Sequence, residues 1–336
     1  MHLHRRWPLA APLLVLLVLL TSLVFVGACG DDGAATDGAV DSGGDDGGGS
    51  DAGDAGTMDT GAGDTGTTAD SSVLDGGPMD TGTDAAMAGS VGCIDGAGLA
   101  EGEHTFMLEG LSRRFIVRLP IGYTRDRPWP VVLALHGNGG SASYWDGTSG
   151  SRDIRGVLED DAVLIVAEAI DGRWRDYDMP SDTWPARIES ELLYFDEVIS
   201  QATAELCVNE GAIFSMGFSG GGSFSGVLGC RRTDIRAIAV GGSVIYFDTD
   251  ACVNTPAAWV TIGEGELSSG REAYRDFWRD RASCDATTMS TAPDPCVAYD
   301  GCGAATPVHY CQHPAGHIWP DFASDAMWGF FGPLVE

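Results

Sequence analysis

Apolar runs and helical patterns alternate along residues 106–331. Residues 106–108 and 114–119 are expected to form a hairpin around Gly110. Nearly continuous apolar runs follow at 130–136, 162–167, 212–217, 235–240, 257–262 and 307–310. Runs of this length suit strands that are buried on both faces of a parallel sheet. Helices are expected over 189–205, 269–281 and 323–331. The alternation predicts an α/β fold with a mainly parallel sheet flanked by helices.

Residues 1–28 have the pattern of an export signal. A short basic stretch precedes an apolar run over residues 9–26, and small residues lead to Cys29. A Cys at this place resembles the bacterial lipobox, which predicts that Cys29 is lipidated and anchors the mature chain to a membrane. The alternative is an uncleaved anchor, since about 18–20 apolar residues can span a bilayer. Both place the remainder outside the cytoplasm, and Gly30 after the Cys, in place of Asp, favours the outer membrane or cell surface.

Residues 29–92 are expected to form a disordered linker that begins with the lipidated Cys. Between positions 31 and 90 the chain holds 14 Asp and no Glu, Arg, Lys or aromatic residue. Such a segment cannot bury enough apolar area to offset its conformational entropy. The remaining residues, 93–336, have the size of one α/β domain. The net charge of the chain is −30, which disfavours nucleic acid as a partner because phosphate contacts need clustered cations.

Eight cysteines remain once Cys29 is assigned to the lipid. An even number in an exported chain predicts up to four disulfides, and the sequence alone leaves their pairing open. No two of them have the C-x₂-C spacing of a zinc finger, and the histidines do not cluster with them. The eight are Cys93, Cys207, Cys230, Cys252, Cys284, Cys296, Cys302 and Cys311.

A candidate nucleophile follows the apolar run at 212–217. Residues 217–221 read Gly-Phe-Ser-Gly-Gly, which matches the pattern G-x-S-x-G. The pattern alone is weak in a chain rich in Gly and Ser, but here a buried strand precedes it and a helix-compatible segment follows. That setting is typical of a nucleophile elbow, in which glycines relieve the crowding around a strained serine. We therefore expect Ser219 to be the nucleophile; a Gly/Ser-rich turn without chemistry is the alternative.

A serine nucleophile needs an oxyanion hole made of two backbone N–H donors. One donor is expected from Gly220, directly after Ser219. The other is expected from the glycine-rich loop that follows the strand at 130–136. Residues 136–140 of this loop read His-Gly-Asn-Gly-Gly, and we assign the second donor to the backbone around Asn138.

The serine also needs a base, and the expected chain order is serine, acid, histidine. His309 lies inside the last predicted strand. His317 lies in a loop between this strand and the closing helix, where a catalytic histidine is usually placed. His317 is therefore favoured over His313, its neighbour in sequence.

The acid is expected after the strand at 257–262. Glu264 and Glu266 both follow it, and either carboxylate is able to orient an imidazole and stabilise its charged form. Asp248 and Asp250, which follow the preceding strand, are the fall-back candidates.

In this order, the motifs resemble those of the secreted esterases that group feruloyl esterases of the carbohydrate-esterase type with polyhydroxybutyrate depolymerase-like proteins. The resemblance implies an α/β-hydrolase fold, no metal or other cofactor, and ester hydrolysis through an acyl-enzyme. By position, Ser219 and His317 carry over as nucleophile and base. The segments that carry the resemblance, within about 93–331, are 114–120, 122–123, 136–140, 206–208, 217–221, 278–284, 299–302, 316–317 and 319–320.

One motif departs from the family pattern. The family usually has His-Gly-x-x-Asp after the strand at 257–262, whereas residues 262–266 read Ile-Gly-Glu-Gly-Glu here. Glu266 falls at the position of the Asp, and Glu is able to serve as the acid. The resemblance also implies that Cys284 pairs with Cys302.

These patterns predict an exported, membrane-anchored serine esterase. Its expected substrates are feruloyl or acetyl esters of polysaccharide, or a polyhydroxyalkanoate-type polyester. The altered acid motif motivates one alternative, a catalytically inactive surface binding lipoprotein with the same fold, and a peptidase is a further alternative. Four tryptophans are candidates for lining an aromatic or sugar-facing substrate site, with ordinary core or surface positions as the alternative: Trp145, Trp174, Trp184 and Trp319.

Overall fold

The computed structural model describes residues 89–336. The chain divides into two units, residues 1–77 and 78–336, and every described residue belongs to the second. The predicted signal peptide, Cys29 and nearly all of the predicted linker lie outside the described residues. Of the linker, only 89–92 is described. Ser90 is buried and its Oγ donates a hydrogen bond to the carbonyl oxygen of Leu206 at 2.7 Å, so contact with the domain begins before Cys93.

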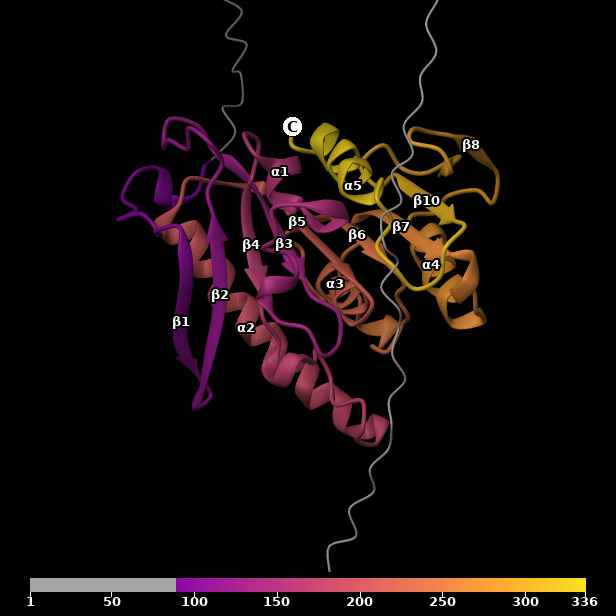
Figure 1. Ribbon diagram of the computed structural model, residues 1–336, viewed down its shortest axis with the longest axis horizontal. Coiled ribbons are helices and arrows are strands. Elements are labelled where there is room, and N and C mark those ends of the chain that lie inside the picture. Colours follow the sequence, from indigo (N-terminus) through magenta and orange to yellow (C-terminus); the bar gives the residue numbers. More distant parts are fainter. Residues whose placement is uncertain (1–88) are drawn as a thin grey trace, which may run out of the picture. The chain divides into compact units, whose positions relative to one another are not determined.

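A ten-stranded sheet forms the centre of the domain, in the order β1-β2-β4-β3-β5-β6-β7-β10-β9-β8 (Figure 1). The six strands from β4 to β10 in this order are mutually parallel. The strands at both ends of the order are antiparallel to their neighbours. The strands are β1 (Gly102–Leu108), β2 (Leu111–Arg118), β3 (Trp129–Leu135), β4 (Val163–Ala167), β5 (Val208–Phe218), β6 (Ile235–Gly241), β7 (Ala257–Gly263), β8 (Thr288–Ser290), β9 (Cys296–Tyr299) and β10 (Val308–His313).

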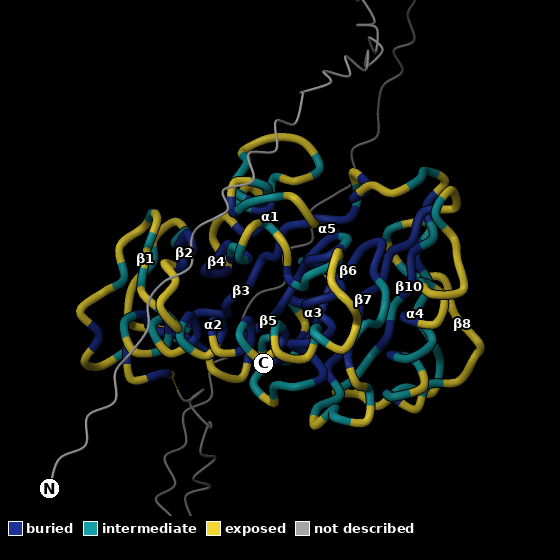
Figure 2. Tube along the Cα trace, turned by 90° about the horizontal axis from the view of Figure 1, so that it is seen from below, coloured by how far each residue is buried: buried dark blue, intermediate teal, exposed yellow. Residues whose placement is uncertain are grey.

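Helices cover both faces of the sheet (Figure 1). Side chains of β3 alternate between two cores: Leu133 belongs to the core that includes side chains of α2 (Trp184–Glu205), α3 (Gly220–Arg231) and α4 (Ser269–Arg281). Val132 belongs to the core that includes side chains of α1 (Ile154–Leu158) and α5 (Ala323–Phe331). The central strands are buried along nearly their whole length (Figure 2). This double burial explains the continuous apolar runs. The predicted α/β-hydrolase fold is confirmed.

Several boundaries differ from the predicted ones. Helix α2 starts at Trp184, five residues before the predicted start, because Pro185 fits the first turn of a helix, where its missing N–H costs nothing. Strand β10 continues to His313, which therefore lies in the strand and not in the following loop. Helix α1 and strands β8 and β9 were not predicted; β8 is exposed at every residue and so has no apolar alternation.

Four disulfides close within the described domain and use all eight of the remaining cysteines. One of them joins Cys284 to Cys302, the pair that the resemblance implies. The other pairs are Cys93–Cys207, Cys230–Cys252 and Cys296–Cys311. In the part of the chain that the structure describes, no helix has the length and apolar character needed to cross a membrane.

Candidate active site

The carboxyl ends of the parallel strands meet at one edge of the sheet, and the predicted site residues lie there. The loop 136–140 follows β3, Ser219 follows β5, Glu266 follows β7, and His317 follows β10. In open α/β sheets this edge is where ligands bind, because the loops after neighbouring strands converge there. The sheet therefore brings together residues that are up to 181 positions apart in the chain.

Ser219 stands on a sharp turn between β5 and α3. Its backbone has φ 57° and ψ −119°, a conformation that costs free energy for any residue other than glycine. The turn holds because its N–H donates to the Gly241 carbonyl at 2.7 Å and its carbonyl accepts from Ser223 N–H at 2.9 Å. Close backbone packing also requires glycine nearby, since a Cβ at Gly221 would overlap the carbonyl oxygens of β3 residue Leu135 and of His136.

Three predicted residues form a continuous row. The hydroxyl of Ser219 lies 2.9 Å from Nε2 of His317, and Nδ1 of His317 is hydrogen-bonded to Oε2 of Glu266. With the proton on Nδ1, the ring donates to the carboxylate and accepts from the serine, which is the tautomer that a general base needs. The Phe218 ring packs against the imidazole, with centroids 4.5 Å apart, and so fixes its plane.

Glu266 is nearly buried and is surrounded by donors. Its side chain is 6% exposed, and its Oε1 accepts from the N–H of Gly263 at 3.1 Å. Burial alone would raise its pKa, but the hydrogen bonds from His317 and Gly263 and the charge of Arg271 outweigh burial and lower the pKa. The carboxylate therefore stays ionised at neutral pH. Arg271, whose Nε lies 2.9 Å from Oε2, gave no signal in the sequence.

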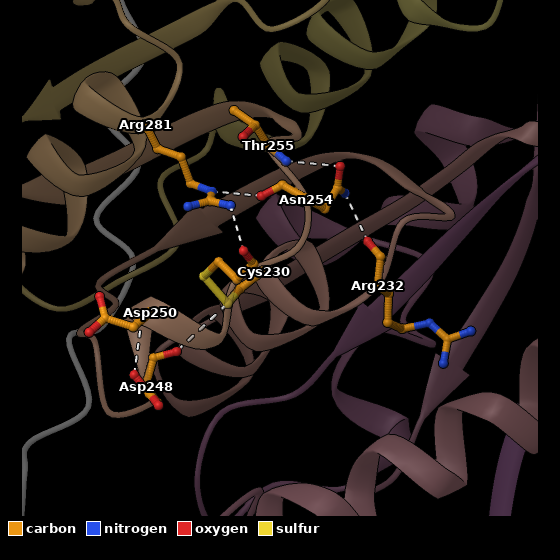
Figure 3. Close-up of a disulfide and its surroundings, with 8 residues drawn as sticks. Cys230, Arg232, Asp248, Asp250, Asn254, Thr255 and Arg281 are labelled. Atoms are coloured by element: carbon orange, nitrogen blue, oxygen red, sulfur yellow. Dashed lines mark hydrogen bonds between the residues drawn. A yellow bond between two sulfur atoms is a disulfide. The ribbon is translucent and has the colours of Figure 1, made fainter.

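The other acid and base candidates lie elsewhere. Glu264 is exposed and makes no contact with His317 in the described chain. Asp248 caps a short 3-10 helix by accepting from the N–H of Asp250 at 3.0 Å, beside the Cys230–Cys252 disulfide (Figure 3). His313 is 2% exposed, and burial lowers its pKa; its ring nitrogens have no hydrogen-bond partner among the described residues.

Two free N–H groups point to an oxyanion hole. Gly139 and Gly140 donate their N–H groups to the carbonyls of Gly172 and Gly137, at 2.9 and 3.0 Å. Within residues 89–336, by contrast, the N–H groups of Asn138 and Gly220 have no protein acceptor. Gly220 is also the first residue of α3, where N–H groups are unpaired and the helix dipole is positive. The pair predicted from the sequence is thus available for a developing negative charge.

His136 holds the oxyanion loop in place. It is fully buried; its Nδ1–H donates to the Gly137 carbonyl at 2.7 Å, and its Nε2 accepts from the N–H of Ala169 at 3.2 Å. Burial lowers the pKa of the ring, which agrees with a neutral histidine that needs one nitrogen as an acceptor. Trp174 donates its indole N–H to the His136 carbonyl at 2.7 Å and so supports the same loop.

A cavity of about 320 Å³ opens at the serine, and the tryptophans do not line it. Its walls are the loop 137–140, Tyr144 and Phe218, beside Ser219 and His317. Of the candidates, Trp145, Trp174 and Trp319 hold the alternative core positions: they are at most 3% exposed and fill the two cores beneath the loops. Tyr144 and Phe218 are the aromatic residues that the sequence did not single out.

Trp184 lies at the same edge of the sheet, in a cluster around Arg175. The guanidinium of Arg175 stacks on the rings of Trp184, Tyr177 and Tyr246, at 3.7, 4.1 and 4.4 Å from their centroids. These contacts join the loop after β4 to the loop after β6. Trp184 thus helps to hold the loops after β4 and β6 together and does not line the cavity.

Among residues 89–336 there is no group of three or more His, Cys, Asp or Glu side chains placed to hold a metal ion.

The sheet order and the strained serine between β5 and α3 give the chain an α/β-hydrolase fold. No protein-family model matches it. It is similar to feruloyl esterase D of Neurospora crassa, with 26% identity over 257 residues, which cover 69% of this chain and 83% of that protein. It is also similar to the probable feruloyl esterase C of Aspergillus terreus, with 25% identity over 265 residues, which cover 73% and 92%. Among solved structures, the acetyl xylan esterase of Aspergillus awamori matches with a TM-score of 0.49 and 12% identity, over 65% of this chain and 93% of that one.

Proposed function

We propose that the protein is an exported serine esterase that cleaves carboxylic esters through an acyl-enzyme. The observation that carries the proposal is the row from Ser219 through His317 to Glu266, with two free N–H groups beside the serine. This is the arrangement that acyl transfer needs: a nucleophile, a base, a group that orients the base, and donors for an oxyanion. The names of the relatives, which are feruloyl esterases, support the same class of reaction.

Acylation begins with attack by the Ser219 oxygen on the ester carbonyl carbon. His317 Nε2 takes the hydroxyl proton as the oxygen–carbon bond forms, and Glu266 stabilises the imidazolium. The carbonyl oxygen gains negative charge and accepts hydrogen bonds from the N–H groups of Gly220 and Asn138. When the tetrahedral intermediate collapses, the bond to the leaving oxygen breaks and His317 returns its proton to the departing alcohol.

Deacylation repeats these steps with water. His317 takes a proton from a water molecule, whose oxygen attacks the acyl carbon. The second tetrahedral intermediate then releases the carboxylic acid, and the proton on His317 returns to the oxygen of Ser219. Because the side chain of His317 is 39% exposed, water reaches the base without a change in the fold.

The size and lining of the cavity favour esters with a small or flat acyl group. Its volume of about 320 Å³ lies at the low end of ligand sites, and Tyr144 and Phe218 add aromatic rings to its lining. Feruloyl esters of polysaccharide fit this description, in keeping with the names of the relatives, and acetyl esters of polysaccharide fit it by size. A polyhydroxyalkanoate-type polyester is the remaining candidate.

The alternative of an inactive binding protein was motivated by the altered acid motif. Glu266 replaces the usual Asp, yet its carboxylate is hydrogen-bonded to His317, so the motif gives no ground for inactivity. The four disulfides support export, because disulfides persist in oxidising compartments. Anchoring through a lipid on Cys29 completes the proposal. Mass spectrometry of the N-terminal peptide of the mature protein tests it, and an unmodified or absent Cys29 would refute it.

A substrate panel tests the proposed activity. Purified protein is assayed on aryl acetates, feruloylated oligosaccharides and polyhydroxybutyrate, and is treated with a fluorophosphonate probe that labels activated serines. Wild type should hydrolyse at least one ester and take up the probe, whereas Ser219→Ala should do neither. Ser200→Ala, at an exposed position on α2, is the matched control and should behave as wild type. Labelling that survives Ser219→Ala would show that another residue is the nucleophile, and absence of both signals in wild type would refute the esterase.

A further inference from the structure

Arg271 contacts both Glu266 and His317, the hydrogen-bonded pair next to Ser219. We propose that Arg271 is a positioning residue: its guanidinium holds the Glu266 carboxylate against His317, and its charge sets the acid limit of activity. The inference rests on the proposed function and adds to it a residue outside the serine–histidine–acid set.

The geometry places the guanidinium at the shared oxygen. Arg271 is the third residue of α4, and its Nε lies 2.9 Å from Oε2 of Glu266, the same oxygen that is hydrogen-bonded to Nδ1 of His317. Its Nη2 lies 3.4 Å from that Nδ1. The side chains of Arg271 and Glu266 are 23% and 6% exposed, so solvent screens the pair only in part.

Glu266 needs such support more than an aspartate would. A glutamate has one more rotatable bond, so holding its carboxylate in one place costs more conformational entropy. Glu266 ends a single 3-10 turn (Glu264–Glu266), which fixes its backbone but not the end of its side chain. Apart from His317, only the N–H of Gly263 and Arg271 hold the carboxylate. Each holds a different oxygen, so together they determine the orientation of the carboxylate plane.

Arg271 acts on Oε2 mainly through its charge. Its Nε is at ion-pair distance but makes no hydrogen bond, because the N–H does not point at the oxygen. The guanidinium keeps its charge throughout the pH range of enzyme assays. Removing the charge favours protonation of the Glu266–His317 pair, which inactivates the base. The acid limb of the pH–rate profile should therefore move to higher pH when the charge is lost.

Few other charges face this pair. From β10, burial lowers the pKa of the His313 ring, which favours its neutral form. Glu264, on the same 3-10 turn as Glu266, is exposed and screened by water. The loops after β5 and β6 present Ser219 and Gly242, which carry no charge. Arg271 is thus the cation that faces Glu266 among the described residues.

The test compares variants that keep or remove the charge. The pH dependence of kcat/KM on an aryl ester is measured for wild type, Arg271→Lys and Arg271→Gln. Arg279→Gln is the matched control, because Arg279 lies on the same helix, is 20% exposed and pairs with Asp276 instead. Arg271→Gln should move the acid limb up by about one pH unit and lower kcat about tenfold. Arg271→Lys should keep the limb near its wild-type position, and Arg279→Gln should change neither quantity.

An equal shift in the Lys and Gln variants, or a wild-type profile in Arg271→Gln, would overturn the inference. If Arg271→Gln does not fold, Arg271→Met keeps the aliphatic stem and replaces it in the comparison. Nitrogen-15 NMR titration of the His317 ring, identified by its loss in His317→Gln, separates the two proposals. A titration that follows the charge at position 271 without any ester turnover would refute the esterase alone. Turnover with an unmoved titration would refute the role of Arg271 alone.

Discussion

Replacing Gly217 by Ala tests whether the strained turn at the serine depends on close backbone packing. Gly217 precedes Phe218 at the end of β5. A Cβ placed there would lie 2.5, 2.6 and 2.7 Å from three backbone atoms of Gly221 and Gly222, where 3.4 Å is the start of ordinary contact. These atoms belong to the first turn of α3, so no side-chain rotation relieves the overlap.

The overlap predicts a clear loss of stability. To restore normal contact, the start of α3 must move by roughly 0.7–0.9 Å against a sheet that is packed on both faces. Overpacking of this kind costs about 1–3 kcal/mol, and a clash with fixed backbone belongs at the upper end. For a domain of this size, about 3 kcal/mol corresponds to a fall in Tm of roughly 6–12 °C.

Thermal and urea unfolding of the oxidised protein, followed by circular dichroism, give the measurement. Gly329→Ala is the matched control: Gly329 is an exposed residue inside α5, and a Cβ there meets no atom within 4 Å. The same substitution should stabilise there by about 0.5–1 kcal/mol, because Gly loses more backbone entropy than Ala on folding. If Gly217→Ala unfolds at the wild-type midpoint, the glycine is not needed for packing and the account of the elbow is wrong.

Substitutions of two acidic residues, Glu266 and Glu168, give further tests. Glu266→Gln should lower kcat by about 10³–10⁴, because His317 loses the charge that stabilises its imidazolium. Glu266→Asp should lower kcat by about 10², because the shorter side chain does not bring its carboxylate to His317. Wild-type rates in steady-state kinetics would contradict both predictions. Glu168 accepts two hydrogen bonds from Arg114 and one from Ala142 N–H, and these outweigh burial and lower its pKa. Its contribution to stability is therefore present above its ordinary pKa of 4.5 and is lost as pH falls through the lower folded value. Glu168→Gln should cost about 1–2 kcal/mol in urea unfolding at pH 7, and a cost that does not shrink below pH 4.5 would count against this account.

The buried framework could be predicted because its physical signal is local. Each central strand is apolar on both faces, so its sequence shows one continuous run wherever it lies in the sheet. Gly217, which packs against the backbone of Gly221 and Gly222, and Gly139, with φ 76°, are likewise local consequences of tight turns. Strand β8 lacks such a signal because all three of its residues are exposed.

The features of the site that could not be predicted depend on contacts between segments that are distant in the sequence. Arg271 reaches His317 across 46 positions, and nothing near it in the sequence marks this contact. The sequence did not decide whether Trp145 and Trp319 line a substrate site or fill the core; their buried rings pack edge to face, 5.3 Å apart. The choice between Glu264 and Glu266 likewise depends on which carboxylate one 3-10 turn directs toward His317.

Strand β5 also separates the first described residues of the domain from Ser219. Ser90 N–H donates to the carbonyl of Val208, the first residue of β5, and the Cys93–Cys207 disulfide secures the same corner. Val208 and Gly217 pair with Trp129 and Leu135, which are six residues apart on β3, so Ser219 lies roughly 20–25 Å away at about 3.3 Å per residue. A solid support or fusion partner joined ahead of Gly89 is therefore attached at the end of β5 that lies away from Ser219. Immobilisation of the domain through a link ahead of Gly89 should therefore leave the cavity at Ser219 accessible to substrate.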